Sequence, residues 1–176
     1  IDHQSLDLVE HRRMCLVAIT TIGAPWRDEA KRRLAIFHGA HLHGRCMGAQ
    51  QKALATDPRV FLYGQDIGNF GGAFKATKNL AAEFPGRVLD APLSEDAIVG
   101  MAIGAAIEGA RPIVEMQFAD FVSTGFNPIV NLLAKQHYRW NEKADVVVRM
   151  PCGGGTQAGP FHSQSNEAWF THVPGL

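Results

Sequence analysis

The chain has 176 residues, and its 17 lysine and arginine residues balance its 17 aspartate and glutamate residues. This balance argues against a global attraction to nucleic acid or to an anionic membrane. No apolar run approaches the roughly 18 residues that span a bilayer, and no signal peptide is evident. The three cysteines, Cys15, Cys46 and Cys152, are widely spaced, which indicates reduced intracellular thiols.

The first part of the chain differs from the rest. Residues 1–40 show only weak helical patterning and no recognisable motif. Residues 1–44 are therefore interpreted as an unassigned extension or linker, ahead of a domain over residues 45–176. The chain starts at Ile1 rather than at a methionine and ends at Leu176 without a polar tail. We expect it to be a piece of a longer protein.

Predicted strands and helices alternate from about residue 44. They are a helix over 47–55, a strand over 60–63, a helix over 77–84, a strand over 87–90, a helix opened by Glu95, a strand over 113–117, a helix over 119–140 bent near Pro128, a strand over 146–148 and a short helix over 166–170. This alternation predicts an α/β domain with a mainly parallel sheet flanked by helices.

Glu95 is the most informative residue of these segments. Pro92 is disfavoured inside a helix, Ser94 is a helix-capping residue, and Gly109 suits a helix end. Glu95 is therefore expected in the first turn of a helix of about four turns. Apart from Asp96 and Glu108, the rest of that helix is almost wholly apolar or Gly/Ala. A carboxylate beside a buried wall is a candidate for acid–base chemistry. The alternative is a carboxylate that offsets the helix dipole, worth about 0.3–1 kcal/mol.

Other candidates follow predicted strands, where ligands of parallel sheets bind. Gln117 ends the strand over 113–117, Phe121 lies just beyond it, and His162 follows the last strand and a glycine-rich loop. His162 is either a proton donor near neutral pH or a surface histidine. Phe121 is either a core aromatic residue or one that stacks on a flat ring.

Three further patterns give weak signals. The segment GQDIGNFGG lacks the Walker lysine and the GxGxxG spacing of nucleotide-binding loops. Cys152 and His162 would suit a nucleophile–base pair, but no third, orienting residue is marked. His41 and His43 form an HxH pair without a third ligand at a suitable spacing, so no metal site is predicted.

Four long segments occur in the order typical of one enzyme family. They are GQDIGNFGGAFKAT, RVLDAPLSEDAIVGMAIGAA, VEMQFADFVSTGFNPIVNLLAK and VVVRMPCGGGTQAGPFHSQSNEAWFTHVPGL. Together they resemble the β-type, pyrimidine-binding, transketolase-like domain of thiamine diphosphate-dependent 2-oxo acid dehydrogenases. QFADF and GPFHSQSNEAW are most similar to the branched-chain (2-oxoisovalerate) enzymes. The resemblance covers residues 58–176.

The resemblance implies roles for four residues. Glu95 would be catalytic and would bind the cofactor by a hydrogen bond to its aminopyrimidine ring, which promotes loss of the C2 proton. Gln117 and Phe121 would also bind this ring, although many relatives have tyrosine at the position of Phe121. His162 would be the catalytic histidine implicated in decarboxylation and in acyl transfer to the lipoyl arm.

The resemblance also implies a partner. The cofactor's diphosphate and Mg²⁺ would require an α-type subunit or fused domain with a GDG…N signature, and GDG does not occur in this sequence. The expected reaction is oxidative decarboxylation of branched-chain 2-oxo acids, with acyl transfer to lipoyl-lysine of the acyltransferase of the complex. It would take place in the cytoplasm of a bacterium, or in the mitochondrial matrix of a eukaryote. A further, C-terminal domain of the family would follow Leu176.

Three alternatives stay open. The nearest is the β-type subunit of pyruvate dehydrogenase, which differs in substrate. A transketolase-like enzyme is a second, although HSQSNEAWF fits it less well. The third is not an enzyme: a catalytically inert fragment that keeps only the fold and the interface.

Overall fold

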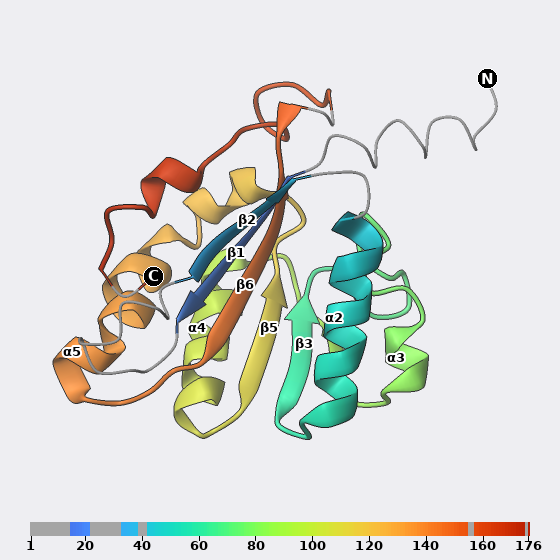
Figure 1. The fold of residues 1–176 in the computed structure, drawn as a ribbon, viewed down its shortest axis with the longest axis horizontal. Coiled ribbons are helices and arrows are strands. Elements are labelled where there is room, and N and C mark those ends of the chain that lie inside the picture. Colours follow the sequence, from blue (N-terminus) through green and yellow to red (C-terminus); the bar gives the residue numbers. More distant parts are fainter. Residues whose placement is uncertain (1–14, 22–32, 39–41, 155–156, 175) are drawn as a thin grey trace.

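A computed structural model of the chain describes residues 15–21, 33–38, 42–154, 157–174 and 176. Its strands are β1 (Cys15–Thr21), β2 (Arg33–His38), β3 (Val60–Gly64), β4 (Val88–Asp90), β5 (Arg111–Glu115) and β6 (Val146–Cys152). They form one sheet in the order β2-β1-β6-β5-β3-β4 (Figure 1). The last four strands of this order are parallel, and β1 and β2 add an antiparallel edge. The predicted α/β fold with a mainly parallel sheet is confirmed.

The order of the parallel strands contains a topological switch point. Strand β3 lies between β4 and β5, so the chain first extends the sheet on one side of β3 and then on the other. In the chain, helix α2 (Leu42–Thr56) precedes β3, α3 (Leu80–Glu83) lies between β3 and β4, and α4 (Glu95–Ile107) lies between β4 and β5. In open α/β sheets, ligands bind beyond the carboxyl ends of the strands at such a point.

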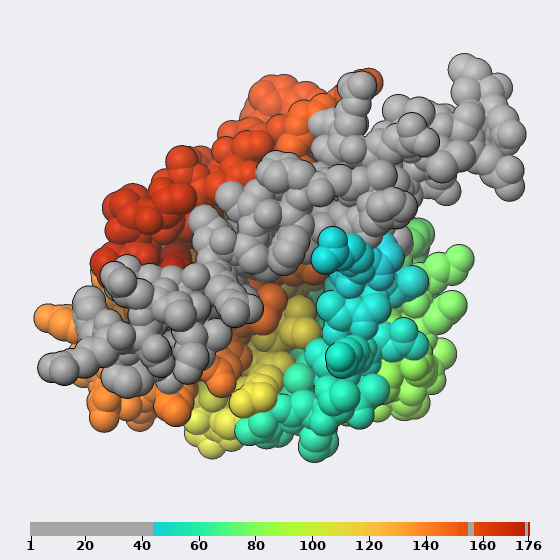
Figure 2. Space-filling model, viewed as in Figure 1, coloured from blue at the N-terminus to red at the C-terminus, as the bar shows by residue number. Residues whose placement is uncertain are grey.

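Both faces of the sheet are covered by apolar side chains. One cluster joins α2, α3, β3 and β4, and includes Leu54, Leu62, Leu80 and Val88. The other joins α4, β5 and β6, and includes Val99, Ala102, Val114, Val148 and Met150. Neighbouring residues of β5 contact different clusters because side chains alternate along a strand. In Figure 2 the segment after β6 (red) lies at the upper left of the view and α2 (cyan) at the right.

Helix α4 follows its prediction from local signals. Ser94 is the N-cap residue, with an extended φ of −165°, although its side chain makes no capping hydrogen bond. At the other end, Gly109 adopts a φ of +93°, which favours glycine. The backbone N–H groups of Gly109 and Ala110 donate to carbonyls of the last turn, 3.0 Å away in each case, as in a Schellman motif. Glu95 therefore occupies the first turn, as predicted.

The segment over 119–140 is not the single bent helix that was predicted. It consists of a 3-10 turn η2 (Ala119–Ser123), a π-helical turn η3 (Pro128–Leu132), a 3-10 turn η4 (Leu133–Lys135) and a short helix α5 (Gln136–Trp140). Pro128 has no N–H group to continue an α-helix from the preceding turn. The predicted helix over 77–84 is also shorter, because Asn79 adopts a φ of +68° directly before α3.

Part of the predicted extension belongs to the sheet. Strand β1 pairs with β6 from Cys15 opposite Cys152 to Thr21 opposite Val146, and β2 pairs with β1. The weak helical patterning over 1–40 is thus wrong at residues 15–21 and 33–38, which are strands. The other residues of that range, 1–14, 22–32 and 39–40, lie outside the described part of the chain, as does His41 of the HxH pair.

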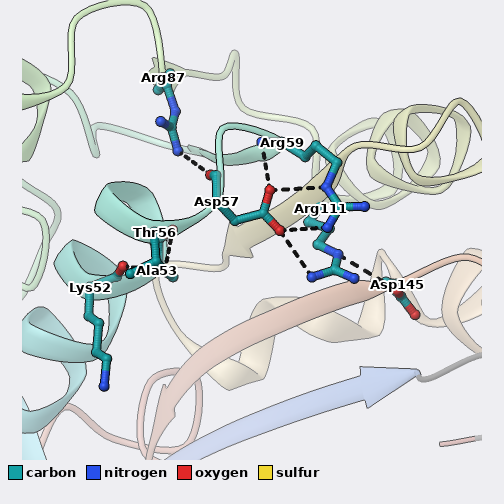
Figure 3. Close-up of polar contacts among 8 residues, drawn as sticks. All are labelled: Lys52, Ala53, Thr56, Asp57, Arg59, Arg87, Arg111 and Asp145. Atoms are coloured by element: carbon teal, nitrogen blue, oxygen red, sulfur yellow. Dashed lines mark hydrogen bonds and ion pairs between the residues drawn. The ribbon is translucent and has the colours of Figure 1, made fainter.

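An arginine–aspartate network ties the amino ends of the parallel strands together (Figure 3). The Asp57 carboxylate, before β3, accepts hydrogen bonds from Arg59 at 2.8 and 3.0 Å and from Arg111 of β5 at 3.0 Å. Arg87, before β4, donates to the Asp57 carbonyl at 2.8 Å. Arg111 also lies 3.9 Å from Asp145, before β6. The hydrogen bonds from Arg59 hold the pKa of the Asp57 carboxyl well below its usual range.

Within the described residues, every helix is too short or too polar to cross a membrane.

Candidate active site

The loops that follow β3, β4 and β5 meet at the switch point. Gln65 follows β3, Glu95 opens α4 after β4, and Gln117 follows β5. The Gln65 amide Nε2 donates to Glu95 Oε1 across 3.2 Å. Asp66, the residue after Gln65, accepts a hydrogen bond at its Oδ2 from the Gln117 amide across 2.9 Å. Three loops thus place hydrogen-bonded polar side chains beyond the carboxyl ends of these strands.

Both carboxylate oxygens of Glu95 lie within reach of a donor from another loop. Oε1 faces Gln65, and Oε2 lies 3.2 Å from the hydroxyl of Thr124, just after η2. The same hydroxyl is 2.8 Å from the carbonyl oxygen of Phe121. Glu95 is half-buried and stands at the N-terminus of α4, where the helix dipole also favours a carboxylate. A role in offsetting the helix dipole is therefore compatible with a role in acid–base chemistry, because the same carboxylate is also oriented by these two contacts.

Gln65 is a site residue that sequence reasoning missed. Its side chain is 3% exposed, and its Oε1 has no hydrogen-bond partner among the described residues. A buried polar atom without a partner costs free energy, so such atoms are rare in folded proteins. The signal available in the sequence was its place in the chain, a polar residue directly after an apolar strand.

Phe121 and His162 lie side by side in an aromatic cluster. The His162 ring lies 5.4 Å from the Phe121 ring and 4.7 Å from the Phe118 ring, edge-on in both cases. Phe118 also contacts Phe74, from the loop after β3, at 5.3 Å. His162 is half-buried rather than fully exposed on the surface. Through Phe121 and Thr124, the cluster connects to Glu95, so the structure brings the four predicted site residues to one region.

A buried ion pair lies under the loop after β3. Glu115 of β5 and Arg149 of β6 are opposite one another in the sheet, and their side chains form a salt bridge. The two residues are 3% and 6% exposed, and burial lowers the pKa of the Arg149 guanidinium to about 10. Gly72 covers the pair: it has a φ of +81°, and a Cβ there would lie 3.1 Å from Glu115 Oε1. Sequence reasoning did not find this pair, since its members lie within strands.

Cys152, the candidate nucleophile, belongs to the core. Its side chain is fully buried at the end of β6, and its thiol donates to the Glu167 carboxylate across 3.7 Å. Burial in apolar surroundings makes a thiol less reactive.

The chain is similar to known proteins in sequence and in structure. The family model described as "Transketolase, pyrimidine binding domain" matches residues 44–176. The chain is 40% identical over its whole length to the mitochondrial 2-oxoisovalerate dehydrogenase subunit beta of Chaetomium thermophilum. Over 73% of its length it is 49% identical to the 2-oxoisovalerate dehydrogenase subunit beta of Bacillus subtilis. Over 72% it is 45% identical to the pyruvate dehydrogenase E1 component subunit beta of Leifsonia xyli.

The chain covers only part of each of these relatives: 37%, 40% and 38% of their respective lengths. Among solved structures, it is similar to a protein titled "Split gene transketolase, inactive beta4 tetramer". That similarity has a TM-score of 0.56 at 20% sequence identity and covers 75% of this chain and 40% of the other. At this identity, the similarity supports the fold alone.

Proposed function

Because this chain belongs to the family of the transketolase pyrimidine-binding domain, we propose that it is the pyrimidine-binding part of a thiamine diphosphate-dependent 2-oxo acid dehydrogenase. The reaction is the oxidative decarboxylation of branched-chain 2-oxo acids, with acyl transfer to lipoyl-lysine. The relatives named 2-oxoisovalerate dehydrogenase subunit beta support the branched-chain substrate. The similarity to a pyruvate dehydrogenase subunit keeps pyruvate as the alternative.

The observation that carries this proposal is the hydrogen bonding of Glu95. Gln65 and Thr124 come from two different loops and contact the two oxygens of one carboxylate. Such contacts limit the orientations of the side chain, so its oxygens face a defined direction at the switch point. Simple dipole compensation at a helix start requires no such partners. A carboxylate with a fixed orientation suits proton placement on a bound ring.

The residues here fit the pyrimidine end of thiamine diphosphate. The Oε1 atom of Gln65 is a buried acceptor without a partner among the described residues, on a side chain that contacts Glu95. An aminopyrimidine ring carries an amino donor and ring-nitrogen acceptors, which such a site complements. Glu95 would hold the ring by a hydrogen bond, Gln117 would line the pocket, and Phe121 would pack on the ring. When bound, the cofactor supplies the electron sink for loss of CO₂ from a 2-oxo acid.

The remaining tasks fall to this chain's own side chains. Glu95 holds or releases a proton at its carboxylate oxygens, while Gln65 and Thr124 keep that carboxylate in place. His162 presents its ring beside Phe118 and Phe121, where it donates a proton to the substrate and assists acyl transfer to the lipoyl arm. The roles of Glu95, Gln117 and Phe121, and the part of His162 in decarboxylation and acyl transfer, are those that the family resemblance implies.

The activity requires a second protein part. We propose that an α-type domain, fused or separate, binds the diphosphate and Mg²⁺, and that the lipoyl-bearing acyltransferase receives the acyl group. The relatives' names as beta subunits support the existence of an α-type partner.

The test of the proposed function is a reconstituted decarboxylation assay. The full-length protein that contains this chain is mixed with its α-type part, thiamine diphosphate, Mg²⁺, and either 3-methyl-2-oxobutanoate or pyruvate. We expect CO₂ release with a higher kcat/KM for the branched substrate. A higher value for pyruvate would favour the alternative substrate. No release from either 2-oxo acid would support the inert-fragment alternative and contradict the proposal.

Glu95→Gln tests the central residue in the same preparation. The variant keeps the size of the side chain but loses the ionisable group, so exchange of the cofactor's C2 proton should fall by about 10²–10⁴-fold. Glu108→Gln is the matched control, because Glu108 is exposed at the opposite end of α4. Circular dichroism should show that both variants stay folded. Exchange at the wild-type rate in Glu95→Gln would contradict the assigned role.

A further inference from the structure

The His162 ring rests on a short segment that the chain forms just after β5. This segment runs from Phe118 to Phe121 and includes the first turn of η2. Phe118 and Phe121 both contact the His162 ring, with centroid distances of 4.7 and 5.4 Å. Edge-on aromatic contacts restrict the position of a ring but leave the backbone that carries it free to move.

The two residues between these phenylalanines hold that backbone. Asp120 Oδ1 accepts a hydrogen bond from the backbone N–H of Gln164, across 3.2 Å. The carbonyl oxygen of Ala119 accepts a hydrogen bond from the Asn166 side chain, across 3.0 Å. The Gln164 carbonyl in turn accepts a hydrogen bond from the Gly153 N–H at 3.3 Å, which connects the loop to the end of β6. Every residue of 118–121 therefore contacts the segment that carries His162.

The Asp120 carboxylate is an unusual group to place here. The residue is 7% exposed, and its Oδ2 has no hydrogen-bond partner among the described residues. Burying a carboxylate is costly unless hydrogen bonds compensate for the lost water. The bond from the Gln164 N–H is the compensation that the described residues provide, and it lies two residues from His162.

We propose that Asp120 is a positioning residue that holds the His162 loop against η2. The inference rests on the proposed function, in which His162 acts on the substrate and on the lipoyl arm. Fixing the backbone of the loop in advance removes conformations that His162 would otherwise have to leave before each reaction. Asp120 acts through His162 and does not need to touch substrate or cofactor.

Amide hydrogen exchange in the assembled holoenzyme tests the docking without relying on activity. Asp120→Ala removes the acceptor, and Asp120→Leu also removes it but fills the buried volume in case the alanine variant does not fold. In either variant, peptides that contain Gln164 should exchange about tenfold faster or more. Asp120→Asn keeps an acceptor oxygen and should stay close to wild type. Ser123→Ala is the control, because among the described residues the Ser123 hydroxyl bonds only to the Asp120 carbonyl, within η2.

Acyl transfer to a lipoyl domain tests the consequence for His162. Asp120→Ala should slow transfer by about tenfold, with an unchanged KM for thiamine diphosphate, and Asp120→Asn should restore most of the rate. The double variant Asp120→Ala/His162→Ala should be no slower than His162→Ala alone, since both changes act through one group. Unchanged exchange at Gln164, or additive losses in the double variant, would overturn the proposal. If the wild type transfers no acyl group, the proposed function fails, and the exchange result alone decides whether Asp120 docks the loop.

Discussion

Replacing Arg149 by methionine would leave Glu115 as an unpaired charge in the interior. The pair is almost fully buried, at 6% and 3% exposure, and Glu115 Oε1 already lacks a partner among the described residues. Methionine keeps most of the volume of the arginine stem, so the cavity term is small. The cost is therefore the desolvation of the stranded carboxylate, about 3–5 kcal/mol. That is a large share of a domain's stability of about 5–15 kcal/mol.

Urea denaturation, followed by circular dichroism, measures this cost. With a denaturant slope of about 2 kcal/mol per M, the midpoint of Arg149→Met should fall by about 1.5–2.5 M. The double variant Glu115→Leu/Arg149→Met carries no buried charge, and its stability should return to near that of the wild type. Arg111→Met is the exposed control: its ion pair with Asp57 is half-exposed on the arginine side and should be worth about 0–1 kcal/mol.

Two results would refute this reasoning. One is a loss below about 1 kcal/mol for Arg149→Met, which would mean that water reaches the stranded Glu115 carboxylate. The other is a double variant as unstable as the single one, which would place the cost in packing rather than in charge.

Substitutions at four other positions have defined expectations. Thr124→Val removes the hydroxyl beside Glu95 and should lower the kcat of the holoenzyme about tenfold. Thr124→Ser keeps the hydroxyl and should keep the rate. Equal rates in the two variants would contradict a role for this hydroxyl. Because hydrogen bonds hold the pKa of Asp57 low in the folded state, this residue stabilises the fold above the ordinary aspartate pKa, and the contribution is lost as the pH falls. Asp57→Asn should therefore flatten the decline of stability below about pH 4 in acid titrations, and an unchanged decline would disagree. Gly64→Ala would place a Cβ 2.7 Å from a backbone oxygen of β5 and cost about 1–3 kcal/mol. Gly100→Ala, which meets open space on α4, should raise stability by about 0.5–1 kcal/mol, and thermal melts that reverse this order would contradict both assignments.

The elements predicted well are those with local signals. Helix α4 begins and ends where Ser94 and Gly109 predict, because capping depends on neighbours within one turn. Strand β1 could not be predicted in this way, since its partner β6 lies far away in the chain. In the 119–140 segment Pro128 indicated a bend, but helical patterning alone did not predict its division into 3-10, π and α turns.

The site shows the same division between local and non-local information. Glu95 and His162 stood out because carboxylate and imidazole groups are common acid–base catalysts, and because the family motifs around them are long. Gln65 and Asp120 did not stand out, because their significance lies in contacts with residues from other loops. A glutamine after a strand or an aspartate in a short turn has many ordinary roles. Only spatial proximity shows that the first contacts Glu95 and the second supports the His162 loop.

The hydroxyl of Thr124 has one hydrogen but two oxygen neighbours, Glu95 Oε2 and the Phe121 carbonyl. When Glu95 is ionised, the hydroxyl can rotate to donate to the carboxylate. When Glu95 is protonated, its own O–H can donate to the Thr124 oxygen, which then turns its hydrogen to the Phe121 carbonyl. Rotation about a single C–O bond thus keeps Glu95 partnered in both charge states.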